Sequence, residues 1–352
     1  MQRILIFSMV FVIIIAGAVF SAPIHDAAEK GDLAGVKALL KKDPGLLNAR
    51  DREGATPLIL AIGRGKDETA LYLISLGADV KAKNRYGATA LHYASMKGKA
   101  AVIKLLISKG ADVHAKDYEF STTPLHLAAS EGNREAAAAL ISGGANMKAR
   151  GKYGQTPLHN AAHGHKEVLA LLLESGADIQ EKDRNGWSPL HFAARSNDAE
   201  EARLLIARGA EVNAQDREGM TPLHMCTFHD SGGMECAEIL IEAGAKVSSK
   251  AKLNVTPLHT ACSGGNIDKV SLLVAKGAEV KARDTDGDTP LHCAVGSSAV
   301  QSEEGICRTV ELLIKAGADP NARNGKGKTP MALAQDSGLT KVIACLKACG
   351  GK

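Results

Sequence analysis

Apolar residues recur along most of the chain at the spacing of short amphipathic helices. Val102, Leu105 and Leu106 stand at positions i, i+3 and i+4, and the segment 36–40 repeats this spacing nearer the N-terminus. Such spacing places the apolar side chains on one face of an α-helix. The pattern therefore predicts a series of short helices, each with one apolar face.

A four-residue box, Thr-Pro-Leu-His, precedes these apolar stripes and recurs along the chain. The Thr is suited to cap a helix N-terminus, and Pro fits the first helical position because it has no N–H to leave unpaired there. The complete and altered copies begin at Thr56, Thr89, Thr123, Thr156, Ser188, Thr221, Thr256, Thr289 and Thr329. Their spacings are 33, 34, 33, 32, 33, 35, 33 and 40 residues. A near-constant period in this range predicts a stack of repeats and not a single closed core.

The extended pattern around the box is Asp-x-x-Gly-x-Thr-Pro-Leu-His-x-Ala-Ala, followed by Gly-x-x-Glu-Val-x-x-Leu-Leu and Gly-Ala-Asp-Val. This pattern resembles the ankyrin repeat and covers residues 24–350 in about ten units. The resemblance implies an all-α helical repeat solenoid. Each unit would have a β-turn or hairpin finger followed by two antiparallel helices, with fingers and first helices lining a concave face.

We expect one ankyrin domain over residues 23–352. Its N-terminal capping repeat lies near 24–53 and its C-terminal capping repeat near 322–350, where Gln335 and Asp336 replace small apolar residues. A terminal repeat has one neighbour only, so a polar outer face suits it.

Two repeats contain additional residues between their first and second helices. These insertions occupy 228–233 and 296–305. Because both follow a first helix, we expect both loops to emerge at the same end of the stack, opposite the fingers.

The first 22 residues differ from the rest of the chain. A short positive start, Gln2-Arg3, precedes the apolar run 4–15, and small residues suited to signal-peptidase cleavage follow up to Ser21. This order is typical of a secretory signal peptide. The alternative is a short uncleaved membrane anchor. We expect an exported protein, periplasmic or secreted, with a membrane-anchored scaffold or a secreted effector acting on host proteins as alternatives.

Composition agrees with thin helical layers. The chain is 45% hydrophobic but only 3% aromatic, and its net charge is +4. Both charge signs are spread along the chain without a Lys/Arg-rich block, so composition gives no case for nucleic-acid binding.

Candidate chemistry is sparse. Seven histidines belong to the repeated box, and their period separates them too widely to share a metal. We expect each to brace its own or the adjoining finger. The pair His163 and His165 lacks further ligands at metal-binding spacing, and segment 325–329 resembles a phosphate-binding loop only superficially. We expect no cofactor, no small-molecule substrate and no enzyme activity.

Seven cysteines leave at least one thiol free or intermolecular. Cys226 and Cys236 flank the first insertion, and Cys293 and Cys307 flank the second. In an oxidising compartment each pair would form a disulfide across its loop. The alternative is that most of them are small core residues.

Partner-binding residues are sought among the finger tips, where the repeats differ from one another. Candidate aromatic and basic residues there are Tyr86, Tyr118, Phe120, Tyr153, Trp187, Arg85, Lys152 and Arg184. Interfaces enrich Tyr and Trp at their energetic centre. The sequence thus predicts a monomer that binds a protein partner of some acidic character, whereas the alternative is that these rings pack against neighbouring fingers.

Overall fold

The computed structural model describes residues 22–228, 234–297 and 302–352. The predicted signal peptide and much of both insertions lie outside these ranges. By its internal contacts the chain divides into two compact units. Unit 1 comprises residues up to 161 together with 165–178, and unit 2 comprises 162–164 together with the remainder from 179. The single domain expected over 23–352 stays a prediction.

Unit 1 consists of helix pairs. Their first helices are α1 (Pro23–Lys30), α3 (Pro57–Gly63), α5 (Ala90–Met96), α7 (Pro124–Ser130) and α9 (Pro157–Ala161). Their second helices are α2 (Leu33–Lys42), α4 (Asp67–Ser75), α6 (Ala100–Ser108), α8 (Arg134–Ser142) and α10 (Lys166–Glu174), and the short 3-10 helix η1 (Pro44–Asn48) follows α2.

Unit 2 repeats the same arrangement. Its first helices are α11 (Pro189–Ser196), α13 (Pro222–Phe228), α15 (Pro257–Gly264), α17 (Pro290–Gly296) and α19 (Pro330–Asp336). Its second helices are α12 (Ala199–Ala207), α14 (Glu235–Glu242), α16 (Ile267–Ala275), α18 (Glu303–Lys315) and α20 (Thr340–Ala348). A 3-10 turn, η2 (Lys252–Asn254), lies in one finger.

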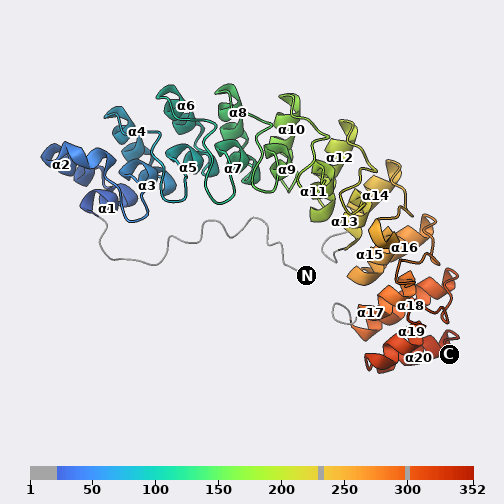
Figure 1. Cartoon of the computed structure of the whole chain (residues 1–352). Helices are drawn as coiled ribbons and strands as arrows, with labels where there is room; N and C mark the ends of the chain where they lie inside the picture. Colours follow the sequence, from blue (N-terminus) through green and yellow to red (C-terminus); the bar gives the residue numbers. More distant parts are fainter. Residues whose placement is uncertain (1–21, 229–233, 298–301) are drawn as a thin grey trace. The chain divides into compact units, whose positions relative to one another are not determined.

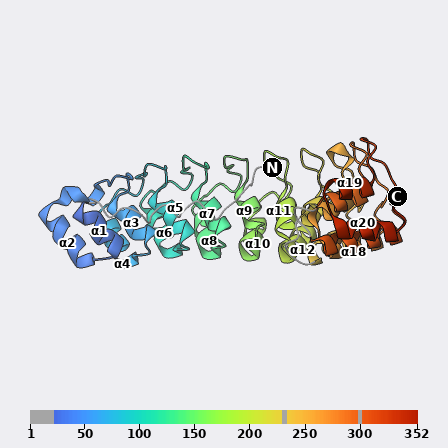
Figure 2. The same ribbon diagram turned by 90° about the horizontal axis from the view of Figure 1, so that it is seen from below.

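Within each unit the helices form two rows, and each first helix packs on the first helices before and after it (Figure 1). Leu125 and Ala129 of α7 and Leu140 of α8 are fully buried, as the apolar pattern predicts. Each repeat therefore contributes one thin apolar layer. The all-α repeat fold is confirmed, and the fingers of unit 1 project to one side of the helices (Figure 2).

Most fingers are tight turns organised by one Asp or Asn side chain. In the finger at 51–55, the Asp51 carboxylate accepts hydrogen bonds from the backbone N–H groups of Glu53 (2.9 Å) and Ala55 (2.8 Å). The Gly54 N–H donates to the Asp51 carbonyl at 3.0 Å. An Asp side chain that bonds the backbone two residues ahead is a recurrent turn-forming device.

The fingers are joined by one backbone hydrogen bond per repeat. In unit 1, the N–H groups of Arg85, Tyr118 and Lys152 donate to carbonyls of the preceding finger over 2.7–2.8 Å. Corresponding bonds in unit 2 begin at Arg217, Lys252, Thr285 and Gly325. We refer to this series as the finger ladder.

One finger is a residue longer than the others, which accounts for the spacing of 34 before Thr123. Ser121 takes the positive φ (54°) that Gly takes in most other fingers. Asp117 accepts from Glu119, Phe120 and Thr122, and the ladder acceptor shifts to the Phe120 carbonyl. The ladder is thus kept despite the added residue.

The histidine of each box bridges two repeats. In α7, the Thr123 N–H donates to His126 Nδ1 (3.2 Å), and His126 Nε2 lies 3.1 Å from the carbonyl of Gln155, just before the next box. The same bridge is formed by His92, His191, His224, His259 and His292. The bracing role predicted for these histidines is confirmed.

This geometry requires a neutral imidazole. A carbonyl accepts only, so Nε2 must carry the proton, and Nδ1 must be free of one to accept the Thr N–H. Burial lowers the pKa of His126, His191 and His224 to about 4, from the usual 6.5. The packing of the repeats therefore favours the neutral form of these histidines.

The first and last of the described repeats depart from the box, and their role as capping repeats stays a prediction. At α1 the N-cap residue Ala22 makes no side-chain cap bond, yet His25 Nε2 still lies 3.0 Å from the Ala49 carbonyl. At the C-terminal end Gln335 and Asp336 are exposed. Among the described residues, no helix combines the length and the apolar character needed to cross a membrane.

Histidine burial predicts acid sensitivity. Because the folded pKa of several histidines is about 4 and the usual value is 6.5, the unfolded chain binds protons first as the pH falls. The stability contributed by the neutral rings is complete above the usual pKa and is lost as the pH approaches the folded pKa. The free energy of unfolding should fall between about pH 7 and pH 5 by about 1.4 kcal/mol per pH unit for each such histidine.

Urea unfolding followed by circular dichroism at several pH values measures this slope. A matched control is His114→Ala, which changes an exposed histidine outside the boxes and should leave the slope unaltered. A free energy of unfolding that stays constant over this range would contradict the assignment.

Candidate binding surface

Three exposed tyrosines lie on successive finger tips of unit 1. Tyr86, Tyr118 and Tyr153 have exposed fractions of 36%, 67% and 49%. We call the tips of these three fingers, residues 83–87, 118–121 and 152–154, the unit-1 finger surface. The structure thus brings together the predicted residues Arg85, Tyr86, Tyr118, Phe120, Lys152 and Tyr153.

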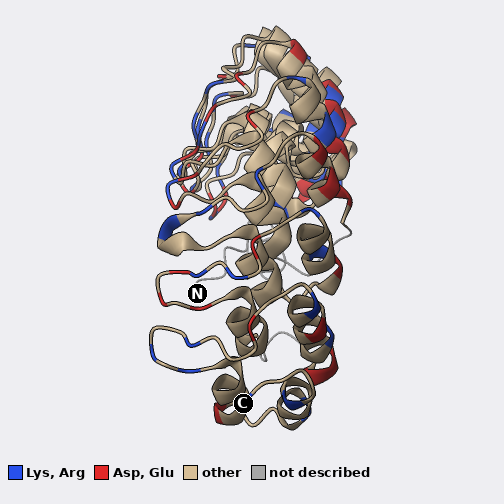
Figure 3. Cartoon of the chain, turned by 90° about the vertical axis from the view of Figure 1, so that its right-hand side faces the viewer, with Lys and Arg blue, Asp and Glu red and all other residues tan. Residues whose placement is uncertain are grey.

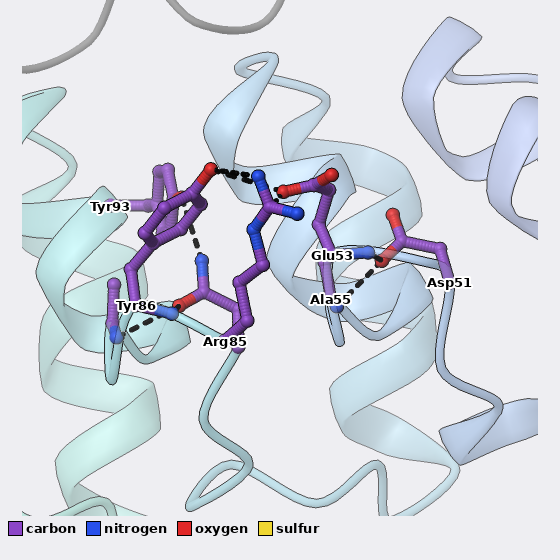
Figure 4. Close-up of polar contacts among 8 residues, drawn as sticks. Asp51, Glu53, Ala55, Arg85, Tyr86 and Tyr93 are labelled. Atoms are coloured by element: carbon purple, nitrogen blue, oxygen red, sulfur yellow. Dashed lines mark hydrogen bonds and ion pairs between the residues drawn. The ribbon is translucent and has the colours of Figure 1, made fainter. Parts of the chain in front are cut away.

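Tyr86 is held by an ionic network with the preceding finger (Figure 4). Its hydroxyl donates to Glu53 Oε2 at 3.1 Å, while Arg85 Nε lies 2.5 Å from the same carboxylate oxygen. The Arg85 guanidinium also lies 4.7 Å from the centre of the Tyr86 ring. Part of the bonding capacity of Tyr86 and Arg85 is therefore used inside the molecule.

Tyr118 is the most open of the three rings. It lies across the preceding finger, where a Cβ atom added to Gly87 would come within 2.8 Å of the ring. Lys83 Nζ lies 5.4 Å from the ring centre, within cation–π range. Gly87, which has a φ of +78°, thus leaves room for the Tyr118 ring to pack against the backbone of the preceding finger.

Phe120 and Tyr153 differ in their availability. Phe120 is half-buried, and its carbonyl accepts the ladder bond from Lys152. Tyr153 is exposed, and Lys152 Nζ lies 6.0 Å from its ring centre. Tyr118 and Tyr153 are consequently the two rings best placed to meet a partner.

Two of these fingers carry no acidic residue. Segments 81–88 and 148–155 contain three basic residues each and lack Asp and Glu. Asn84 and Gly151 stand where other fingers have the turn-forming Asp, and Asn84 Oδ1 makes the same turn bonds to Tyr86 and Ala88 without a charge. Charged side chains lie along the fingers and the second helices, whereas the first helices carry few (Figure 3).

Trp187 and Arg184 belong to unit 2. Arg184 is exposed, but Trp187 is half-buried, and its Nε1–H donates to Asp216 Oδ2 at 2.9 Å. The indole also contacts Phe192 edge-on (ring centres 5.4 Å apart), and Arg195 lies over it at 5.2 Å. The Trp187 ring therefore packs against its own helix and the next finger, which agrees with the alternative that these rings pack inside the molecule.

Leu253 was not selected from the sequence. It is 66% exposed at a finger tip of unit 2 and has a positive φ of 60°. Its position at a finger tip can be read from the sequence, but Leu253 is neither aromatic nor basic and so lies outside the predicted set.

All seven cysteines are free in this structure, and the two predicted disulfides stay predictions. Cys226 and Cys236 are both buried, and the Cys236 thiol together with burial raises the pKa of Cys226. Cys293 lies beside Ser263, whereas Cys307 lies beside Cys345 of the adjacent second helix, whose Sγ is 3.7 Å from the Cys307 carbonyl oxygen.

Other candidate chemistry is accounted for by structure. Thr329 caps α19 by accepting from the Ala332 N–H, so segment 325–329 serves as a finger and cap. No group of three His, Cys, Asp or Glu residues suited to a metal occurs within the described ranges.

A family model for ankyrin repeats (three copies per model) matches the chain at residues 24–117, 114–183, 176–251 and 232–324. These matches cover well over half of the chain. The protein belongs to the ankyrin-repeat family, whose members are protein-interaction scaffolds and typically non-catalytic.

Shorter stretches match curated proteins. The human DNA-binding protein RFXANK is 42% identical over 59 residues, 17% of this chain and 23% of that protein. Human and mouse protein phosphatase 1 regulatory subunit 27 are each 45% identical over 58 residues, 16% of this chain and 37% of theirs. The chain thus matches about a quarter to a third of the length of these relatives.

The role of Trp187 is testable by a substitution that removes its indole N–H and keeps an aromatic ring. Trp187→Phe keeps an aromatic ring but loses the bond to Asp216, which should lower the free energy of unfolding by about 1–2 kcal/mol in urea titrations. Tyr153→Phe, which removes an exposed hydroxyl, is the matched control and should change it by about 0.5 kcal/mol or less. Equal stabilities of the two variants would show that the indole bond contributes nothing.

Proposed function

We propose that this ankyrin-repeat protein is an exported scaffold that binds a protein partner through the unit-1 finger surface and the adjoining first helices. The partner segment that fits this surface is acidic and carries apolar or aromatic residues. The observation that carries the proposal is that exposed Tyr118 and Tyr153 lie within cation–π range of Lys83 and Lys152, two lysines whose own fingers contain no Asp or Glu.

Two physical properties support a contact role for these rings. An exposed tyrosine offers a large apolar area at little conformational cost, and such residues dominate binding energy when a partner covers them. Tyr118 is also restrained by Gly87 and Lys83 before any partner arrives. Less ordering is then required on binding.

The charges of the fingers favour an acidic partner. Around Tyr153, the basic residues Lys148, Arg150 and Lys152 are all exposed. Basic groups in a segment that lacks Asp and Glu attract an acidic partner from a distance and raise its association rate at low salt. Binding should accordingly weaken as ionic strength rises.

The binding proposal is tested by affinity purification from the native compartment. Tyr118→Ala/Tyr153→Ala should reduce recovery of the partner by about tenfold or more, because loss of one hot-spot side chain costs about 2 kcal/mol. The matched control is Leu71→Ala/Leu76→Ala, which removes side chains of 45% and 46% exposure on and just after second helix α4. A partner retained by the tyrosine variant, or lost equally from both, would refute the proposed surface.

Export rests on the order of charged, apolar and small residues in positions 1–22, which lie almost entirely outside the described ranges. Cleavage after Ala18 or Ser21 would release the whole repeat region without its apolar leader. N-terminal sequencing of the protein from cell envelope and medium fractions should begin at residue 19 or 22. Retention of Met1 in a membrane fraction would favour the anchored alternative.

A further inference from the structure

The second helix α18 is longer than the other second helices of unit 2. It has 13 residues, whereas α12, α16 and α20 have 9 and α14 has 8. The extra length lies at its N-terminal end, where the insertion 296–305 enters the helix. That added turn packs against α20, the last helix of the chain.

Two acidic residues of the added turn hold the start of α20. The Glu303 carboxylate accepts from the N–H groups of Lys341 (2.7 Å) and Val342 (3.3 Å), which are unpaired within their own helix. Glu304 forms an ion pair with the Lys341 side chain. A carboxylate at a helix N-terminus also interacts favourably with the helix dipole.

One turn further along both helices, two thiols meet. Cys345 Sγ lies 3.7 Å from the Cys307 carbonyl oxygen and 3.8 Å from Glu311 Oε1, and the two thiols are close enough to shift each other's pKa. Both cysteines are half-buried, so a reagent in solvent can reach them. Their register is fixed by the contacts of Glu303 and Glu304 one turn earlier.

We infer that Cys307 and Cys345 form a disulfide under oxidising conditions and thereby link the C-terminal capping repeat covalently to the repeat before it. The residues are 38 positions apart, so the bond closes a long loop. The inference concerns the chemistry of the folded chain and does not depend on the proposed binding surface.

The bond forms by thiol–disulfide exchange with a disulfide oxidant such as oxidised glutathione or a disulfide-carrying oxidoreductase. One cysteine thiolate attacks the oxidant, forming a mixed disulfide and releasing one reduced thiol. The second thiolate displaces the remaining sulfur, which leaves as the other reduced thiol. The two cysteines lose two protons and two electrons, and the oxidant gains them.

The other cysteines are less suited to this reaction. Cys226, Cys236 and Cys262 are buried, which hinders both thiolate formation and access by an oxidant. Cys349 lies near Cys345 and is the principal competitor.

The reaction of the proposed pair should be slow at neutral pH. Burial is the main reason that the pKa of each thiol is raised. The pKa of Cys345 is raised to about 12. The carboxylate of Glu311 adds to the rise at each. Because the thiolate is the nucleophile, oxidation should accelerate with rising pH and in Glu311→Gln.

The bond would act on the predicted C-terminal capping repeat, whose helices α19 and α20 pack on α17 and α18. A terminal repeat contacts one neighbour only and opens first in a linear array. A covalent link between α18 and α20 couples its opening to that of the preceding repeat.

Peptide mapping identifies the bond directly. The full repeat chain is incubated with oxidised glutathione, free thiols are alkylated, and the protein is digested with trypsin and Glu-C without reductant. Cleavage after Glu304, Arg308, Lys341 and Lys347 places Cys307 in peptide 305–308 and Cys345 in peptide 342–347. Cys293 and Cys349 fall in separate peptides.

A species joining 305–308 to 342–347 is the expected result. If Cys307 stays alkylated throughout, or if its peptide is joined to that of Cys293 or Cys349, the inference is overturned.

Hydrogen exchange supplies a second measurement, in which the oxidised and reduced forms of each variant are compared. Oxidation should slow amide exchange in α20 by about tenfold in the wild type. It should have no effect in Cys307→Ser or Cys345→Ser, and the full effect should persist in the control Cys349→Ser. Equal protection in oxidised Cys345→Ser would show that the slowing has another origin, and it would overturn the link.

Discussion

The neutral histidine that joins one helix cap to the next finger is the interaction on which the rest of the structure depends. The ring of His126 receives the N–H of its own Thr123 and donates to the carbonyl of Gln155 in the following repeat. It therefore fixes the start of a helix and the base of the adjoining finger together. Because fingers held in this way need few side chains for their own support, their tips are free to differ, and the proposed binding surface lies there.

Features that repeat with the chain's own period were predictable from the sequence. The helix caps and the role of the histidines rest on local spacing, which determines the face and the turn that a residue occupies. The arrangement of paired helices was implied by the resemblance to the ankyrin repeat. Tyr93 and Phe192, which stand on first helices, are 5% and 8% exposed and belong to the core. Local patterns also identified which tyrosines stand on finger tips.

Features that depend on contact between repeats were harder to predict. Trp187 stands at a finger tip, but its indole N–H is satisfied by Asp216, 29 residues later. Cys293 and Cys307 flank one insertion in sequence, yet Cys307 lies on helix α18 beside Cys345 of α20. Sequence separation alone does not determine which side chains of successive repeats lie at the same height, and the added turn of α18 altered that register.

The finger ladder has a consequence for how the chain tolerates changes in length. The spacings of 35 and 40 arise from residues placed between paired helices, and the ladder bonds of Lys252 and Gly325 remain intact. A single added residue in a finger requires compensation, as at Ser121. Insertions and deletions should therefore accumulate at the helix–helix connections, while the tips keep a constant interval. A partner that spans several fingers would need contacts repeated at that same interval.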